Sequence, residues 1–372
     1  MKLSVERAAL LKTLSHAQSV VERRNTIPIL ANILLRASGN SISLAATDMD
    51  LEIGETMPGS VAKPGELTVS AHMLYDIVRK LPETATVELE RPDNSNQLIL
   101  KAGRSQFKLG TLPVEDFPLM REDTLATRFT MPAATLRGMI DRTRFAISTE
   151  ETRYYLNGIY IHTTMSQGKS VLRAVATDGH RLARVEIDAP DGTAELPGVI
   201  LPRKTVNELR KLLDETNDAV TIELAPTKVR VTFGEVTLTS KLIDGTYPDY
   251  ERVIPAGNDK VMNVATKELA QAVDRVATVS TEKSRAIKLA LQKGMLTITA
   301  QSAEAGSANE ELEVDYQDSK LEIGFNARYL LDIAQQIGGE TTRVVLADAG
   351  APALVEDPAD ATSLFVLMPM RV

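Results

Sequence analysis

The sequence predicts an α+β protein of three tandem repeats, each made of two half-units in which a strand leads into a helix and further strands follow. Three observations support this fold class: two strand–helix patterns that each recur three times, stretches that alternate with period two, and amphipathic helices that need a sheet to cover one face. The predicted domains are residues 1–126, 127–254 and 255–372.

The first recurring pattern is a short alternating strand, a small or polar residue and then a helical run. Its equivalent strand positions are Val5, Met131 and Val264, which lie 126 and 133 residues apart. Spacings that agree this closely indicate duplicated domains.

The second recurring pattern has the same form, with strand positions at Val69, Leu201 and Phe325 that lie 132 and 124 residues apart. Two independent markers therefore agree on a period near 130 residues. Within each repeat the two patterns lie 64, 70 and 61 residues apart, which divides each domain into two half-units. Tandem duplication by itself does not require the three domains to close into a ring.

Residues between the patterns alternate polar and apolar, as strands with one buried face do. Such stretches include residues 42–45, 86–89, 229–233 and 296–299. The predicted helices carry an apolar stripe with charged residues outside it. The stripe residues are Leu10, Leu11 and Leu14 in the first helix and Leu209, Leu212 and Leu213 in the fourth.

The composition is that of an ordinary globular protein, with 43% apolar and 25% charged residues in a length of 372 that fits two or three domains. No apolar run reaches the length of a membrane span, and the N-terminus meets a charge at once, unlike a signal peptide. The absence of cysteine excludes disulfides and thiolate metal sites. We therefore expect a cytoplasmic protein with no membrane partner.

Charge is unevenly distributed along the chain. The predicted helices with their flanks are residues 5–24, 70–82, 132–146, 202–215, 265–285 and 326–337. They carry 18 basic and 11 acidic side chains, a net charge of +7, which leaves −15 for the rest of a chain of net charge −8. A basic layer on an acidic protein is typical of polyanion binding, although exposed helix faces are also often basic for solubility.

The width of a helix limits what such a layer could enclose. Six helices about 10 Å wide, side by side in a circle, leave a hole of about 9 Å, whereas twelve leave a hole of about 28 Å. B-DNA is roughly 20 Å across. If the helices close a ring, two chains rather than one would surround a duplex.

Eight stretches of sequence carry a family resemblance that covers the whole chain. They are residues 26–32, 103–105, 111–113, 153–158, 176–183, 240–245, 247–250 and 368–372. In this order and spacing the chain resembles the bacterial DNA polymerase III beta sliding clamp family. The resemblance implies three DNA-clamp domains per chain, joined head to tail as a homodimeric ring whose helices line the hole. It further implies a non-enzymatic processivity factor that encircles duplex DNA without regard to base sequence.

The resemblance also implies protein partners: the DNA polymerase III catalytic subunit, the clamp loader and other replication and repair proteins, each bound through a short peptide containing Leu and Phe. The implied pocket lies between the second and third domains, where apolar and Met side chains could adapt to varied ligands. Its residues are Tyr155, Leu156, Thr177, Gly179, His180, Arg181, Leu182, Pro248, Arg252, Val253, Asn326, Tyr329, Val366, Leu367, Met368, Pro369, Met370, Arg371 and Val372.

The apolar C-terminus calls for a reason, because chain ends are usually solvated. A final edge strand would explain residues 364–367, but Pro369 lacks the N–H that a ladder needs and stops the strand. We expect Met368, Pro369 and Met370 to leave the sheet and wall the pocket opposite His180.

Two further surfaces are expected. Side chains expected to face the hole and contact phosphates without reading bases are Arg24, Arg79, Arg137, Lys204 and Arg210. The head-to-tail interface should join a basic and apolar strand to the acidic third domain. Its expected residues are Arg104, Phe107, Leu109, Thr278, Val279, Glu304 and Glu310.

The sequence departs from the family pattern in places. Ser284 stands where some relatives carry an aromatic residue at the pocket rim, and His72 and Met73 occupy a stretch that can be more basic. Glu150 and Glu151 lie in a loop that can touch DNA, where acidic side chains would repel phosphate.

The alternative hypothesis is a hydrolase-like enzyme centred on Asp178 and His180. A general base needs an orienting acid and a substrate proton within reach, and no Gly-x-Ser-x-Gly elbow accompanies the pair. The sequence also has no Gly-rich phosphate loop and no paired-His metal motif. We therefore expect no catalytic residues, no cofactor and no metal.

Overall fold

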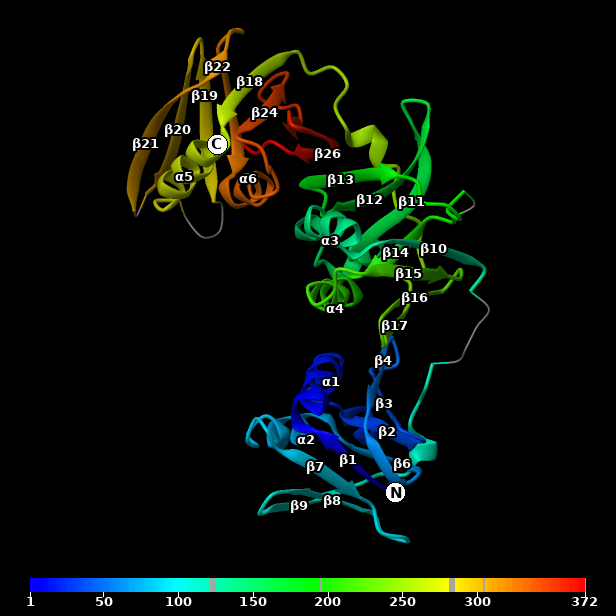
Figure 1. Ribbon diagram of the computed structural model, residues 1–372. Helices are drawn as coiled ribbons and strands as arrows, with labels where there is room; N and C mark the ends of the chain where they lie inside the picture. The colour runs from blue at the N-terminus through cyan, green and yellow to red at the C-terminus, as the bar shows by residue number, and fades with distance from the viewer. Residues whose placement is uncertain (121–124, 195, 281–284, 304, 372) are drawn as a thin grey trace. The chain divides into compact units, whose positions relative to one another are not determined.

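The computed structural model describes residues 1–120, 125–194, 196–280, 285–303 and 305–371 (Figure 1). Backbone packing divides the chain into two compact units, each of which is described by itself. The first unit comprises Met1–Thr135, Pro190–Thr193 and Asn207–Leu242, and the second comprises Leu136–Ala189, Ala194–Val206 and Ile243–Val372.

The first unit contains two antiparallel sheets. The smaller has the order β5 (Ser60–Lys63), β1 (Lys2–Glu6), β7 (Thr86–Glu90), β8 (Gln97–Ala102), β9 (Ser105–Gly110). The larger has the order β10 (Thr127–Pro132), β15 (Ala219–Leu224), β16 (Lys228–Phe233), β17 (Val236–Lys241), β4 (Leu51–Pro58), β3 (Ser41–Thr47), β2 (Asn32–Ser38), β6 (Gly65–Ser70). Helices α1 (Arg7–Val20) and α2 (Ala71–Val78) pack against each other, and α1 also packs on β3 and β4. Short 3-10 helices lie at η1 (Pro28–Ala31) and η2 (Val114–Asp116).

The second unit also contains two antiparallel sheets. One has the order β14 (Val199–Pro202), β11 (Gly158–Ser166), β12 (Lys169–Thr177), β13 (Arg181–Asp188), β26 (Asp360–Leu367), β25 (Ala353–Asp357), β24 (Thr341–Leu346), β18 (Lys260–Ala265), β22 (Asp315–Tyr316). The other has the order β21 (Gly306–Glu313), β20 (Met295–Ser302), β19 (Ala286–Gln292), β23 (Leu321–Asn326). Helices α5 (Thr266–Ala277) and α6 (Ala327–Ala334) lie side by side against this four-stranded sheet (Figure 1).

Two more helices, α3 (Ala133–Asp141) and α4 (Arg203–Leu213), each contribute residues to both units. Three short 3-10 segments belong to the second unit: η3 (Arg144–Ala146), η4 (Glu151–Leu156) and η5 (Tyr250–Val253). Among the described residues, no helix combines the length and the apolar character needed to cross a membrane.

The recurring patterns correspond to the same structural position. Each of the six marker residues is the last but one residue of a strand, and a helix starts directly after that strand. All six side chains are buried, with 5% exposure or less, so each strand sets its inward face at the point where the helix begins. The six markers are Val5, Val69, Met131, Leu201, Val264 and Phe325.

The predicted helix stripes face the interior. Leu10 and Leu14 are fully buried in α1, whereas Leu11, at the margin of the stripe, is only half-buried and Lys12 is exposed. The three stripe leucines of α4, at positions 209, 212 and 213, are likewise buried. Burial of one helix face against a sheet supplies most of the stability of such short helices.

The final strand was expected at a sheet edge, and that expectation is wrong. Strand β26 runs over Asp360–Leu367 and pairs with β13 on one side and β25 on the other. Both rows of backbone groups are therefore bonded, and the side chains of residues 364–367 are all buried. A run of consecutive apolar residues is typical of a strand that is covered on both faces.

Candidate functional site

The turn between β12 and β13 presents His180 on a rigid backbone. Oδ1 of Asp178 accepts hydrogen bonds from the backbone N–H of His180 (2.9 Å) and Arg181 (3.0 Å). The Thr177 hydroxyl donates to the Arg181 carbonyl at 2.7 Å and accepts from Gly179 N–H at 3.1 Å. Gly179 has φ +86°, where a side chain is strained, and a Cβ there would also lie 2.6 Å from Nη1 of Arg153.

Arg181 links this turn to α6. Its guanidinium is 9% exposed and donates to Oδ2 of Asp332 (2.5 Å) and to the Phe145 carbonyl (2.6 Å). It also lies over the Tyr329 ring, 4.3 Å from the centroid, and the His180 ring stacks on the same Tyr329 at 6.1 Å. Nε, Nη1 and Nη2 of Arg181 each make one hydrogen bond within the protein, so this side chain supports the surface from beneath. The expected contact of Arg181 with a ligand stays a prediction.

The C-terminal residues return to the same place. After β26 ends at Leu367, the Met368 N–H donates to the His180 carbonyl and the Met370 N–H donates to the Gly324 carbonyl, both at 2.9 Å. The chain between these bonds is half-buried, and Arg371 is exposed. As expected, residues 368–370 leave the sheet beside His180; Val372 lies outside the described residues.

Beneath this surface is an apolar cluster that contains three of the expected pocket residues. Leu156, Leu182 and Val366 are 4%, 2% and 1% exposed, so they form a floor and not a rim. Tyr155 packs against the cluster. Leu367 is fully buried in the sheet. The buried rings of Tyr247 and Tyr250, which sequence reasoning did not assign to the site, complete the floor.

Other expected pocket residues lie around the cluster with different roles. The Asn326 side chain caps α6 by accepting from the N–H groups of Arg328 and Tyr329. Pro248 is exposed, and the exposed Arg252 pairs with Asp249 at 2.7 Å.

Exposed apolar side chains show which part of the candidate site a ligand can reach. Val253 is 43% exposed and Tyr154, which sequence reasoning missed, is 54% exposed. The signal for Tyr154 was available, because it lies within the family-like stretch at residues 153–158 next to Tyr155. The two tyrosine rings meet edge to face, with centroids 5.8 Å apart.

The side chains expected to contact DNA are not equally available. Arg24 and Arg79 are exposed, but Arg79 pairs with Asp76 at 3.1 Å. Arg210 is half-buried and pairs with Asp214 at 2.5 Å. Arg137 and Lys204 are half-buried on α3 and α4. Partial neutralisation favours weak, mobile phosphate contacts over fixed ones.

Some of the expected interface residues lie at the edges of two sheets of the described structure, at β9 and β21. Arg104 precedes the edge strand β9, which carries the half-buried Phe107 and Leu109. At the edge of the other small sheet, β21 carries Glu310, which is bonded to Arg275 of α5 at 2.5 Å. Thr278 and Val279 follow α5, and Glu304 lies outside the described residues.

The structure shows the surroundings of most residues that depart from the family pattern. Glu150 pairs with Arg153 at 2.6 Å, and this hydrogen bond holds the pKa of the Glu150 carboxyl below its usual value. Glu151 is exposed and opens η4. His72 bonds the Val21 carbonyl through Nε2 at 2.9 Å, and Met73 is 54% exposed. Ser284 lies outside the described residues.

The arrangement of Asp178 and His180 does not form a catalytic pair. The Asp178 carboxylate is occupied by the turn and by Nε of Arg181, at 3.1 Å, while the His180 ring turns to Tyr329. Within the described residues, no group of three His, Cys, Asp or Glu side chains could hold a metal ion.

Comparison with known proteins accounts for the threefold repeat. Three family models of the DNA polymerase III beta subunit match in succession: the N-terminal domain at residues 1–121, the central domain at 130–249 and the C-terminal domain at 251–371. The chain belongs to the DNA polymerase III beta subunit family.

Relatives that align over their full length support the same family. The chain is 54% identical over 372 residues to the beta sliding clamp of Caulobacter vibrioides and 38% identical over 375 residues to that of Escherichia coli, covering 100% of each. A crystal structure of the Caulobacter crescentus clamp superposes with a TM-score of 0.98 at 54% identity, covering 100% of this chain and 99% of that one. The clamp of Bartonella birtlesii, bound to griselimycin, has a TM-score of 0.97 at 47% identity, with complete coverage of both chains.

Membership of this family settles the class of function. The protein is a DNA sliding clamp, a non-enzymatic processivity factor of replication that acts on duplex DNA and tethers the polymerase. The hydrolase alternative is not supported, in agreement with the engaged carboxylate of Asp178.

Proposed function

We propose that the surface around His180 is where this clamp binds its partners, through a short peptide that carries a Leu and an aromatic residue. The observation that supports this most directly is the combination of a buried apolar floor with exposed apolar side chains beside it, at Tyr154 and Val253. An anchor residue that covers such a floor would act as a binding hot spot. A related clamp from Caulobacter crescentus holds polyethylene glycol at what is termed its beta-motif tethering region, which supports a ligand-binding surface of this kind.

We also propose how two chains assemble, which side chains meet DNA and in which compartment the protein works. The domains are residues 1–126, 127–254 and 255–372, and two chains close head to tail through the β9 edge of one and the β21 edge of the other. Two free antiparallel edges, one apolar and basic and one acidic, support this pairing. Arg24, Arg79, Arg137, Lys204 and Arg210 meet the duplex backbone, and the protein works in the cytoplasm.

Topological retention on DNA tests the proposed ring. The protein is loaded on nicked circular DNA by a clamp loader with ATP and then separated by gel filtration. We expect co-elution with the circle and loss within minutes after one restriction cut, because a ring that slides escapes from free ends. Binding of short linear duplex should be weak, salt-sensitive and indifferent to base sequence. Tight, sequence-specific binding to linear duplex would contradict the proposal.

A further inference from the structure

We propose that Arg173 is a positioning residue for the partner-binding surface: it fixes the η5 segment, which carries Arg252 and Val253, against the sheet that carries the His180 turn. This inference rests on the proposed peptide-binding function. The Arg173 side chain is buried, so it acts on the surface through its bonds to Tyr250 and Glu251.

The geometry at Arg173 joins two parts of the chain that are far apart in sequence. Arg173 lies on β12 and its side chain is 6% exposed. Its Nε donates to Oε2 of Glu186, the cross-strand neighbour on β13, at 2.7 Å. Its Nη1 donates to the Tyr250 hydroxyl at 3.1 Å and to Oε1 of Glu251 at 2.6 Å. One planar guanidinium therefore bonds the sheet on one side and η5 on the other.

The segment that Arg173 holds has little stability of its own. It is a single 3-10 turn of four residues, and its N-cap, Asp249, makes no side-chain capping bond. Short 3-10 turns have poor hydrogen-bond geometry, so tertiary contacts fix their position. Of the segment's side chains, Tyr250 is buried whereas Glu251, Arg252 and Val253 are exposed.

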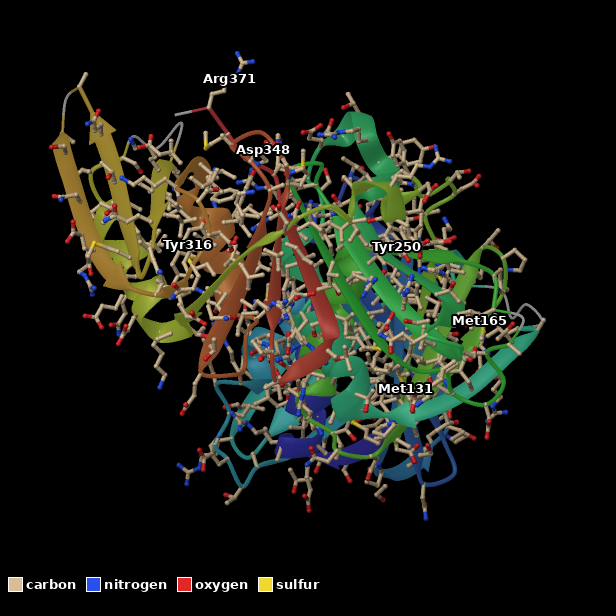
Figure 2. The ribbon with its side chains drawn as sticks, turned by 90° about the horizontal axis from the view of Figure 1, so that it is seen from above. Met131, Met165, Tyr250, Tyr316, Asp348 and Arg371 are labelled. Atoms are coloured by element: carbon tan, nitrogen blue, oxygen red, sulfur yellow. The ribbon has the colours of Figure 1, made fainter. Side chains whose placement is uncertain are left out.

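Tyr250, labelled in Figure 2, connects Arg173 to the apolar floor. Its ring belongs to the cluster that contains Leu156, Leu182 and Val366. Because Arg173 can only donate, the Tyr250 oxygen accepts from it and can donate its own proton to Nε2 of His162, 2.9 Å away. Burial lowers the pKa of His162, which favours the neutral imidazole, and with its proton on Nδ1 the ring accepts at Nε2.

The buried charge of Arg173 has to be compensated by its hydrogen-bond partners. Burial by itself would lower the pKa of Arg173, but its hydrogen bonds to Glu186, Tyr250 and Glu251 outweigh burial and raise it. Arg184, on β13, is also half-buried, and burial together with the charge of Arg173 lowers its pKa. A lysine at position 173 would supply a point charge and could not make these directed bonds together.

The experiment uses the full-length protein and a fluorescent peptide that contains Leu and Phe, with affinity and dissociation rate measured beside the melting temperature. Tyr250→Phe removes the bond at the hydroxyl, and Glu251→Gln replaces the charged acceptor of the other bond by a neutral amide oxygen. Both variants leave Arg252 and Val253 in place. We expect each to weaken the affinity by about five- to tenfold, less than the full loss of a hydrogen bond with a charged partner, because the effect reaches the peptide only through the position of η5. The faster dissociation rate should carry most of the change.

A matched variant separates positioning from stability. Asp360→Asn likewise replaces the charged acceptor of a bond to Arg142 by a neutral amide oxygen, in the same unit and at the far end of β26 from Leu367. At a similar loss of melting temperature it should leave the peptide affinity within twofold. The double variant Arg173→Lys with Glu251→Gln should lose little more affinity than Arg173→Lys alone, because both act through one contact.

Three results are decisive. Unchanged affinity in Tyr250→Phe and Glu251→Gln would overturn the positioning role while leaving the proposed peptide surface intact. An affinity loss in Asp360→Asn as large as theirs would reduce Arg173 to a general stabiliser. Failure of the unaltered protein to bind the peptide would instead refute the proposed function, and with it this inference.

Discussion

His16 shows how one side chain can decide a local charge balance. It lies on α1, 7% exposed, with Nδ1 2.7 Å from Oε2 of Glu55 and Nε2 3.0 Å from Oε1 of Glu215. Because an ionised carboxylate only accepts, both ring nitrogens can donate to these two carboxylates only when the imidazole is protonated. Burial alone would lower the pKa of His16, but the bonds to the two carboxylates outweigh it and raise the pKa.

The raised pKa predicts a pH-dependent stability. Because the folded pKa exceeds the unfolded value of about 6.5, the contribution of His16 is complete below that pH and disappears as pH rises through the folded pKa. A hydrogen bond to a charged group contributes about 1.5–3 kcal/mol. We therefore expect His16→Gln to lower the melting temperature by several degrees at pH 6 and by much less at pH 9.

The neighbouring charges must be controlled in that measurement. Lys12 pairs with Glu215 at 3.4 Å, and Lys211 pairs with Glu208, which accepts from Ser19 of α1. Glu235 also lines the cavity of about 320 Å³ beside His16. Lys12→Met provides the matched control, since its effect on melting should be nearly the same at both pH values. A His16→Gln effect that is equally large at pH 9 would contradict the charged state.

At the scale of elements, the C-terminal segment gives a prediction of its own. Deletion of residues 368–372 removes two backbone hydrogen bonds, to His180 and Gly324, and the side chains of Met368 and Met370. Both methionines are half-buried in the free protein, so covering them with a ligand contributes about half of the roughly 3–6 kcal/mol of two fully exposed side chains, before ordering costs. We expect the truncated protein to lose at least tenfold in peptide affinity by calorimetric titration, while its melting temperature changes little.

A second variant distinguishes side chains from backbone. Met368→Ala with Met370→Ala keeps both backbone bonds and should lose most of the same affinity. If truncation instead unfolds the protein, the segment is part of the core. If both variants bind as the unaltered protein does, the C-terminus is not part of the site.

At the scale of the whole molecule, the free edge at β9 predicts dimer formation. Phe107 and Leu109 are half-buried in a single chain, so full burial in a partner would contribute about 1 kcal/mol each, part of the gain of a fully exposed side chain. Phe107→Ala with Leu109→Ala should therefore raise the dimer dissociation constant at least tenfold in analytical ultracentrifugation. Met165→Ala removes an apolar side chain that is 64% exposed on β11 (labelled in Figure 2) and should leave the dimer unchanged. A monomeric unaltered protein at micromolar concentration would refute the proposed closure.

Much of the fold was predictable because its signals are local. The six strand-to-helix junctions follow from residues within about ten positions of each marker, and their spacing follows from duplication. Helix faces could likewise be assigned from stripes such as Leu10 and Leu14, because the period of a helix is a property of the chain itself. The basic helical layer could be counted, since charge needs no coordinates.

From the sequence alone, the candidate site was predictable only as a set of family-like stretches. The stretches around Tyr155, His180 and the C-terminus identified the family, and that resemblance placed them together. What each side chain does there was not visible in the sequence. Arg181 was expected in the pocket and is a buried side chain bonded to Asp332, and Leu367 was expected in the pocket and in an edge strand and is buried in a central strand.

The sequence by itself therefore determined the repeat, the elements and the family of this protein. Only the tertiary structure decided which polar groups meet: His16 with Glu215 across 199 positions, and Arg173 with Glu251 across 78. Such pairs leave no local pattern in the sequence, because any acidic side chain could pair with any basic side chain until the chain has folded. Burial then selects one partner, since a charge removed from water must be compensated by the group that packing places within reach.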